Sequence, residues 1–218
     1  MLNILKTQLS AGVRRSLRLA AFEFEIQRRH RRAMSSARQL SGPFKLNLGC
    51  GEVIKAGWIN VDLFARAANL SLDLREPLPF GAGTASFIYA EHFLEHLEFP
   101  TEVIRILQES YRVLAVGGVL RVGVPDAGDF AKIYASGNRE RFRQNWNPNY
   151  PEWLGIPMHR LNYCFRQMGD HKYAYDEEIL IIAFRDAGFK DVKRSEFIPE
   201  LDSESRRDGT LYVTGIKG

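Results

Sequence analysis

The sequence has only two cysteines, Cys50 and Cys164, among its 218 residues. Two cysteines are too few for a disulfide framework, and the lack of a C-x-x-C pair argues against a zinc knuckle. No uncharged apolar run approaches the roughly 18 residues that a membrane-spanning helix requires. The remaining composition, 45% hydrophobic and 26% charged, is typical of a globular chain long enough for one good core.

Acidic residues are scarce only near the start of the chain. Residues 1–40 hold nine basic and two acidic residues, a net charge of +7, whereas residues 41–218 hold 21 basic and 24 acidic residues, a net charge of −3. The formal net charge of +4 and the isoelectric point near 9.1 therefore come from this N-terminal arm. Because the rest of the chain is slightly acidic, we expect no nucleic-acid partner.

Apolar residues recur every three or four positions in residues 1–40, which predicts a basic amphipathic helical arm. Three interpretations stay open: a helix packed on its own domain or on a second subunit, a helix lying on an anionic membrane surface, and a cleaved organelle-targeting peptide. We expect a cytoplasmic protein whose arm contacts the inner face of the membrane or forms a homodimer. As a separate unit, the arm would be dispensable for ligand binding by residues 41–218. The apolar residues are Leu2, Leu5, Leu9, Val13, Leu17, Ala20 and Phe24.

A breaker cluster, Ser41-Gly42-Pro43, predicts a boundary before a second unit over residues 41–218. In this unit short apolar runs alternate with helical stretches or tight loops, which indicates a mostly parallel sheet. Helices are expected over residues 101–113 and 176–187, the second with Asp176 as its N-cap. The expected strands are residues 44–48, 58–61, 69–72, 86–90, 119–124, 191–197 and 210–216.

Polar residues follow several of these strands, where open α/β sheets bind their ligands. The first strand runs into Gly49-Cys50-Gly51, and the second ends at Asp62. A dinucleotide fingerprint fails, because Ile54 replaces its last glycine and Asp62 comes too early for the usual spacing of about 20 residues. A ligand with a ribose but without a pyrophosphate fits better, since a carboxylate accepts hydrogen bonds from both ribose hydroxyls.

Five motifs in order resemble those of class I S-adenosylmethionine-dependent methyltransferases, and the subgroup most similar is the small methyltransferases linked to cell-surface polysaccharide synthesis. The resemblance implies a Rossmann-like three-layer α/β sandwich with about seven strands, mostly parallel, and an antiparallel last strand. The sequence departs from many members at Asn47, where they carry an acid, and at Val53, where they carry a glycine. The motifs are KLNLGCG (45–51), GWINVDL (57–63), DLREPLPF (73–80), YAEHFLEHL (89–97) and YRVL with GGVL (111–114 and 117–120).

The resemblance also implies which residues bind S-adenosyl-L-methionine. Asn47, Gly49, Cys50 and Gly51 would lie along its methionine part. Asp62 would accept from the ribose, with Leu63 against the adenine. Asp73 would accept from the adenine amine, with Leu74 beside it. The methyl-donor end would be lined by Ala90, Glu91 and His92.

Two other functions compete with methyl transfer. His92, Glu95 and His96 form an H-x-x-E-H pattern, which is typical of inverted zinc peptidases. The glycine loop would then have no role, so we expect no metal. A non-catalytic module that keeps the fold and the cofactor is the other alternative.

Residues 142–175 carry eight aromatic residues with interspersed proline, which predicts an insertion or lid over the site. We expect a small polar acceptor there, such as a saccharide or a cell-envelope precursor, and candidate catalytic residues His171, His159 and Asp126, because methyl transfer to oxygen or nitrogen benefits from a nearby base. The aromatic residues are Phe142, Trp146, Tyr150, Trp153, Tyr163, Phe165, Tyr173 and Tyr175.

Overall fold

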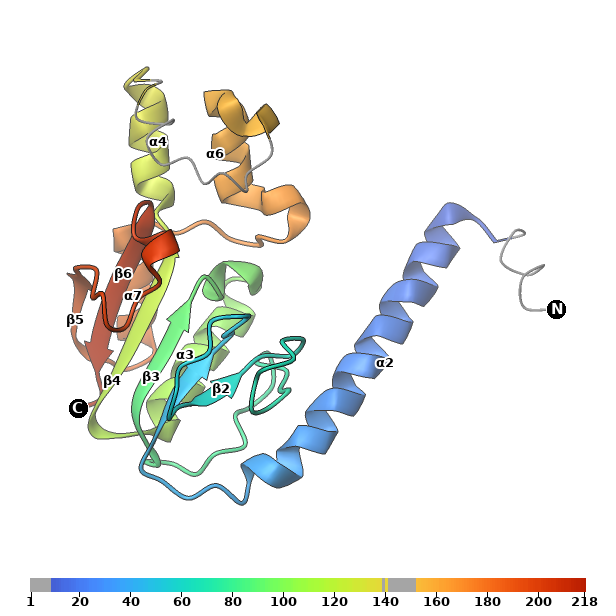
Figure 1. The fold of residues 1–218 in the computed structure, drawn as a ribbon, viewed down its shortest axis with the longest axis vertical. Helices are drawn as coiled ribbons and strands as arrows, with labels where there is room; N and C mark the ends of the chain where they lie inside the picture. Colours follow the sequence, from blue (N-terminus) through green and yellow to red (C-terminus); the bar gives the residue numbers. More distant parts are fainter. Residues whose placement is uncertain (1–8, 139, 141–151) are drawn as a thin grey trace.

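The computed structural model of the chain describes residues 9–138, 140 and 152–218 (Figure 1). Its strands form one sheet in the order β2-β1-β3-β4-β6-β5. The strands are β1 (Phe44–Leu48), β2 (Ile59–Val61), β3 (Ala85–Glu91), β4 (Leu114–Pro125), β5 (Lys190–Ser195) and β6 (Thr210–Ile216).

Strands β1 to β4 pair in parallel, and β6 runs antiparallel to both of its neighbours, β4 and β5. This confirms the predicted α/β class, with a mostly parallel sheet and an antiparallel last strand. The sheet has six strands in the described residues, where about seven were predicted. The strand predicted over residues 69–72 is reduced to a bridge between Val61 and Leu70. One reason is that the backbone N–H of Asn60 donates to the side chain of Asn69 (2.8 Å) instead of a strand carbonyl.

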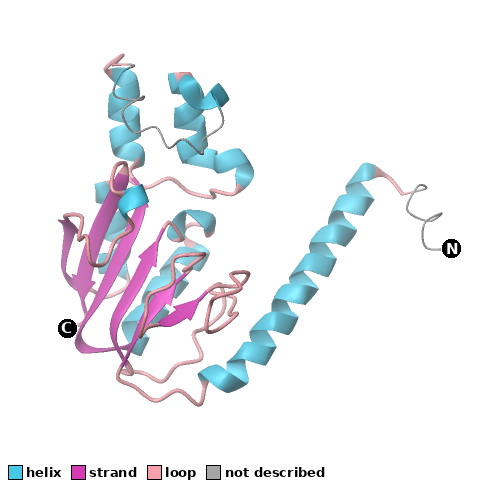
Figure 2. Ribbon diagram, viewed as in Figure 1, coloured by secondary structure: helices cyan, strands magenta, loops and turns pink. Residues whose placement is uncertain are grey.

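Helices α3 and α7 cover one face of the sheet (Figure 2). Helix α3 buries Val103, Ile106 and Leu107, which recur at helical spacing. The side chain of Asp176 accepts from the backbone N–H of Ile179 (3.0 Å), so it caps α7 as predicted. The α-helices are α2 (Ala11–Ala37), α3 (Thr101–Val113), α4 (Ala127–Ala135), α6 (Pro157–Arg166) and α7 (Glu177–Asp186); the 3-10 helices are η1 (Leu94–His96), η2 (Glu152–Gly155), η3 (Gln167–Gly169) and η4 (Glu204–Arg206).

The opposite face of the sheet is polar at its centre. Arg121 of β4 is fully buried there, and its Nε donates to Asp202 Oδ1 (2.9 Å). A second bond joins Arg121 Nη2 to Asp202 Oδ2. Tyr89 of β3 donates to the same carboxylate (3.2 Å). These bonds hold the segment of residues 196–209, which connects β5 to β6, over this face. The third layer that the resemblance implied is formed here by connecting segments rather than by a long helix.

Helix α2 lies within the predicted arm, and its second half packs on residues 41–218. Ala37 belongs to the main core, and Ile26 is also buried. The ring of Phe22 stacks on Phe64 at 5.4 Å. Arg29 donates to the carbonyl of Leu63 (3.3 Å). The second half of α2 therefore shares buried contacts with residues on the far side of the boundary predicted at residue 41.

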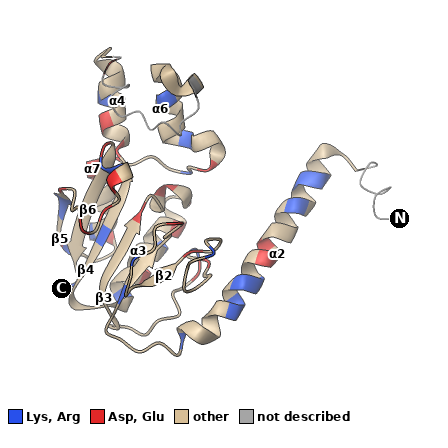
Figure 3. Ribbon diagram, viewed as in Figure 1, with Lys and Arg blue, Asp and Glu red and all other residues tan. Residues whose placement is uncertain are grey.

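The first half of α2 keeps its apolar residues exposed. The side chains of Val13 and Leu17 are exposed, as is that of Phe24 further along the helix, and Leu2 and Leu5 lie outside the described residues. Basic residues are spread along the helix (Figure 3). Within the described residues, no helix is long and apolar enough to cross a membrane. Contact of residues 1–40 with a membrane surface or with a second copy stays a prediction.

Two N-terminal deletions separate the halves of α2. The contacts of α2 with the body described above lie between Phe22 and Ala37, so deletion of residues 1–21 should leave the free energy of unfolding nearly unchanged. Deletion of residues 1–40 should lower it by about 2–4 kcal/mol, because a buried isoleucine such as Ile26 alone contributes about 1.5–3 kcal/mol. Urea unfolding of the two truncated proteins measures this difference. Equal stabilities would contradict the packing of α2 on the body.

The substitution Asp202→Asn tests the buried ion pair. It leaves the charge of Arg121 buried without its counter-charge, so the free energy of unfolding should fall by about 3–5 kcal/mol. The control is Glu204→Gln, which removes the exposed pair with Arg207 (2.9 Å) and should cost less than about 1 kcal/mol. Chemical denaturation of both variants provides the measurement. A loss for Asp202→Asn no larger than that of the control would contradict the role of the pair.

Candidate active site

The glycine loop that follows β1 has the left-handed backbone that glycine adopts most easily. The φ angles of Gly49 and Gly51 are +62° and +49°. A Cβ atom at Gly49 would lie 2.5 Å from the ring of Phe93, so only glycine lets this ring approach the loop. A Cβ atom at Gly51 would meet nothing within 4 Å. The surface of the loop at Gly51 is therefore open to a ligand.

Asp62, at the end of β2, is tied directly to this loop. Its Oδ2 accepts from the backbone N–H of Gly51 (3.0 Å), and its Oδ1 accepts from the N–H groups of Phe64 and Ala65 (both 2.8 Å). The residue is half-buried. Oδ2 of Asp62 accepts this one hydrogen bond within the described residues, and a carboxylate oxygen can accept a second one from a ligand. The side-chain amide of Asn47 donates to the carbonyl of Val53 (2.9 Å), which supports the loop.

Asp73 lies against helix α2. Its carboxylate accepts from Nε and Nη2 of Arg75 (3.0 and 2.9 Å), and Arg75 also pairs with Glu23 of α2 (2.8 Å). Burial opposes ionisation of Asp73, but its hydrogen bonds with Arg75 prevail and lower its pKa. The backbone N–H of Asp73 donates to His30 of α2 (3.1 Å). Leu74 beside it is buried in the core.

Glu91, at the end of β3, binds the β5–β6 segment. Its carboxylate accepts from the backbone N–H of Ser203 (3.1 Å) and from the hydroxyl of Tyr212 (2.8 Å). Arg206 donates to the backbone carbonyl of Glu91 (3.0 Å). Ala90, its neighbour in β3, points into the core on the other face. Glu91 therefore positions residues 203–206 at the carboxyl edge of the sheet.

His92 follows β3 in a left-handed conformation (φ 54°), which is rare for residues other than glycine. It lines a cavity of about 80 Å³ at the carboxyl edge of the sheet, where residues of α4 and α6 also contribute to the lining. Residues from the end of β3, from α6 and from the β5–β6 segment meet in its wall. The lining residues are His92, Pro125, Phe130, Leu154, Arg160, Tyr163, Cys164, Gln167, His171, Ser205, Arg206, Asp208, Gly209 and Thr210.

The predicted insertion supplies part of this wall. Leu154, Arg160, Tyr163, Cys164, Gln167 and His171 all come from residues 152–171. The ring of Trp153 packs edge-on against those of His159 and Tyr163. Phe142, Trp146 and Tyr150 lie outside the described residues.

A buried carboxyl group, Glu95, lies next to the cavity. Its Oε1 is 3.6 Å from Nδ1 of His92. Burial raises the pKa of Glu95 to about 8 and lowers the pKa of His92 to about 3, so the two do not form an ion pair at neutral pH. Burial also lowers the pKa values of His96 and His171. All three imidazoles are therefore neutral near pH 7.

The H-x-x-E-H pattern does not form the helical arrangement that a peptidase would need. Only Leu94–His96 is helical, as one 3-10 turn, and His92 precedes it in the left-handed conformation. The ligand atoms that the structure brings together are those of Glu95, His96 and His171. This geometry argues against the zinc-peptidase alternative.

Of the three predicted catalytic residues, only His171 lines the cavity. Asp126 caps α4 by accepting from the N–H of Asp129 (2.9 Å) and binds Arg194 (3.3 Å). His159 is exposed and bonds to the carbonyl of Trp153 (2.8 Å). Asp126 and His159 thus make structural contacts outside the lining of this cavity.

Neither cysteine is an activated nucleophile. Burial raises the pKa of the Cys50 thiol to about 11 and that of Cys164 to about 12. Both are therefore protonated at neutral pH, when a thiol reacts poorly. Cys50 serves as a small buried residue in the turn of the glycine loop.

A family model described as a methyltransferase domain matches residues 46–122. The matched segment contains the glycine loop, Asp62, Asp73 and the end of β3. This match over about a third of the chain supports a methyltransferase that uses S-adenosylmethionine.

Solved methyltransferase structures are among those similar to this chain. An S-adenosylmethionine-dependent methyltransferase from Archaeoglobus fulgidus is 16% identical, with 89% of this chain and 94% of that chain covered and a TM-score of 0.50. A possible histamine N-methyltransferase from Thermotoga maritima is 19% identical, with 94% and 97% covered and a TM-score of 0.47. At these identities the likeness concerns the fold alone. No curated protein matches the sequence.

The residues present in this methyltransferase fit S-adenosylmethionine. The glycine loop leaves open space at Gly51, and the half-buried carboxylate of Asp62 beside it can accept from ribose hydroxyls. Leu63 follows Asp62 directly, where an adenine would need an apolar contact. We assign the ribose to Asp62 as a proposal. The adenine contact of Asp73 is also a proposal, since the same carboxylate already binds Arg75.

Sequence reasoning missed several residues of the candidate active site. Arg160, Arg206 and Thr210 line the cavity, although no motif marks them. Arg206 lies in the polar run of residues 203–208, and only its contact with Glu91 at the end of β3 reveals its place. Glu95 and His96 stood out in the sequence, but their meeting with His171 follows from the fold.

Replacement of the two loop glycines by alanine should have unequal effects on this methyltransferase. Gly51→Ala places a side chain in the left-handed region, which costs about 1–2 kcal/mol of unfolding free energy. Gly49→Ala adds a clash with Phe93, so it should be clearly more destabilising. Thermal unfolding of both variants measures the difference. Equal losses would show that Phe93 does not pack over Gly49 as described.

Proposed function

We propose that this methyltransferase methylates a small polar acceptor whose reacting end enters the cavity at the carboxyl edge of the sheet. The supporting observation is the position of His92. It lines the cavity, and it directly follows Ala90 and Glu91 in the motif that the family resemblance relates to the methyl-donor end. A volume of about 80 Å³ suits the reacting end of a molecule rather than a whole oligosaccharide.

A saccharide or a cell-envelope precursor is the acceptor class that we propose. The cavity wall offers guanidinium groups from Arg160 and Arg206, a hydroxyl from Thr210 and the ring of Tyr163. Such a mixture of donors, acceptors and aromatic surface suits a ligand rich in hydroxyl groups. The net charge of −3 over residues 41–218 gives no electrostatic reason to expect a polyanionic polymer.

S-adenosylmethionine, when bound, supplies a methyl group on a positively charged sulfur. A lone pair on the acceptor oxygen or nitrogen forms the new bond to the methyl carbon, the carbon–sulfur bond breaks with its electrons on sulfur, and the acceptor proton leaves to water. The main task of the chain is therefore to hold the acceptor in line and to exclude competing nucleophiles. His92 and His171, both neutral, line the cavity where this occurs.

Transfer of labelled methyl groups tests the proposal. Calorimetry should show binding of S-adenosylmethionine, and labelled S-adenosylmethionine should transfer its methyl group to a component of a saccharide or envelope-precursor fraction. With that acceptor, His171→Ala should lower turnover by about 100-fold, because the loss of its imidazole disturbs the position of the acceptor. The affinity for S-adenosylmethionine should not change.

The matched control is His159→Ala, which removes an exposed histidine of the same segment and should retain turnover. Cofactor binding without methyl transfer to any saccharide, lipid-precursor or metabolite fraction would instead indicate a non-catalytic module. Full turnover of His171→Ala would exclude His171 from the reaction.

A further inference from the structure

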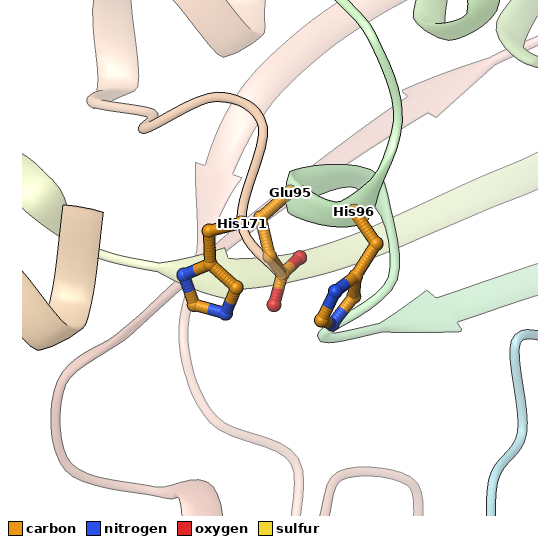
Figure 4. Close-up of side chains that lie close together, drawn as sticks. All are labelled: Glu95, His96 and His171. Atoms are coloured by element: carbon orange, nitrogen blue, oxygen red, sulfur yellow. The ribbon is translucent and has the colours of Figure 1, made fainter. Parts of the chain in front are cut away.

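Three potential metal ligands from distant parts of the chain meet beside the cavity. Glu95 and His96 lie in η1, directly after β3, whereas His171 follows η3. One ligand atom from each residue lies within 4.8 Å of the other two. Figure 4 shows the carboxylate of Glu95 between the two imidazole rings. The backbone holds the two segments together, because the N–H of Lys172 donates to the carbonyl of Glu95 (2.7 Å).

Among the residues that the structure describes, none donates a hydrogen bond to the carboxyl group of Glu95. Its side chain is 2% exposed, and neither oxygen has a hydrogen-bond partner among the described residues. A buried carboxylate in that situation is costly unless a cation neutralises it. The site therefore requires either a proton on Glu95 or a metal ion beside it.

The histidines of the cluster direct lone pairs to the site rather than protons. His171 Nδ1 lies 2.7 Å from the carbonyl of Cys164, and His96 Nδ1 lies 3.2 Å from the carbonyl of Asp170. A carbonyl only accepts, so each Nδ1 carries the proton and each Nε2 keeps its lone pair. A hydrogen bond from the distal N–H to a backbone carbonyl is typical of metal-binding histidines, because it fixes both ring orientation and tautomer.

The same argument applies to the neighbouring His92. Its Nε2 lies 2.9 Å from Thr210 Oγ1, and Thr210 donates its single hydroxyl proton to the carbonyl of Arg206 (2.6 Å). His92 Nε2 must therefore be the donor to Thr210, which leaves a lone pair on Nδ1. That atom faces Glu95 Oε1 at 3.6 Å. The imidazole of His92 thus supplies no proton to Glu95.

We propose that Glu95, His96 and His171 bind a divalent first-row transition-metal ion beside the cavity that His171 lines. Two neutral imidazoles and one carboxylate suit Mn²⁺, Fe²⁺ and Zn²⁺, and three protein ligands leave coordination positions open for other groups. The bound ion removes the cost of the isolated Glu95 carboxylate.

The position of His171 gives this ion a role, which rests on the proposed function. Because His171 lines the cavity, an acceptor hydroxyl there can reach an open position of the ion. A metal ion held by Glu95, His96 and His171 would lower the pKa of this hydroxyl, whose proton would leave to water. The oxygen lone pair would then form the bond to the methyl carbon as the carbon–sulfur bond breaks with its electrons on sulfur. A hydroxyl is accordingly the acceptor group that the site favours.

Metal titration of the full chain tests the site without cofactor or acceptor. After treatment with EDTA and dialysis, calorimetry with MnCl₂ and with ZnCl₂ should show one ion per chain, and mass spectrometry of the elements should confirm the stoichiometry. Glu95→Gln and His96→Gln should each weaken binding by at least about tenfold, since even outer partners of metal ligands change affinity by about 10–100-fold. His96 is exposed, so its replacement does not endanger folding.

His159→Gln is the control, because His159 also bonds to a carbonyl but lies outside the cluster. The affinity of this variant for the metal ion should equal that of the unchanged protein. Lack of a stoichiometric ion, or unchanged affinity in Glu95→Gln and His96→Gln, would overturn the metal site and leave Glu95 as a protonated carboxyl. Equal weakening by His159→Gln would do the same. Metal binding without methyl transfer would contradict the proposed function alone, and methyl transfer unaffected by EDTA would contradict the role of the ion.

Discussion

The buried pair of Arg121 and Asp202 determines how the polar face of the sheet is closed. Without a long helix on this face in the described residues, the β5–β6 segment must cover it, and a loop contributes little apolar surface for that purpose. Asp202 anchors the segment, since its carboxylate accepts from Arg121, from Tyr89 and from the backbone N–H of Ile198 (2.7 Å). A buried carboxylate such as that of Asp202 is stable only when a counter-charge and hydrogen-bond donors pair with its oxygens.

The wall of the cavity follows from that anchor. Ser203, next to Asp202, bonds to Glu91, and Arg206 bonds to the carbonyl of Glu91 while it also lines the cavity. A bond between β4 and residue 202 thus fixes residues 203–206 at the end of β3. The family resemblance relates Glu91 to the cofactor, but in this structure its carboxylate accepts from Ser203 and so holds this segment in place. The polar face and the candidate active site are therefore one connected structure.

The fold could be predicted where periodicity and motifs act locally. Residues 44–48, 101–113 and 210–216 form β1, α3 and β6 with the predicted bounds. The strand expected over residues 69–72 failed because the side chain of Asn69 replaces a backbone partner, and propensity does not reveal that choice. The glycine loop and Asp62 were predictable from their spacing, since both lie at the ends of adjacent parallel strands. Arg206 and the meeting of Glu95 with His171 were not, because they depend on contacts between segments far apart in sequence.

Helix α2 shows the same limit of sequence reasoning, and its contacts change the interpretation of the basic net charge of residues 1–40. The period predicted the helix, and the scarcity of acids suggested an appendage with a function of its own. Yet Glu23, one of its two acids, binds Arg75, which in turn binds Asp73. His30 accepts from the backbone of the same aspartate. The second half of α2 therefore packs on the loops that follow β2, next to the residues proposed to hold the adenosine, whereas a role of its exposed first half in location or assembly stays a proposal.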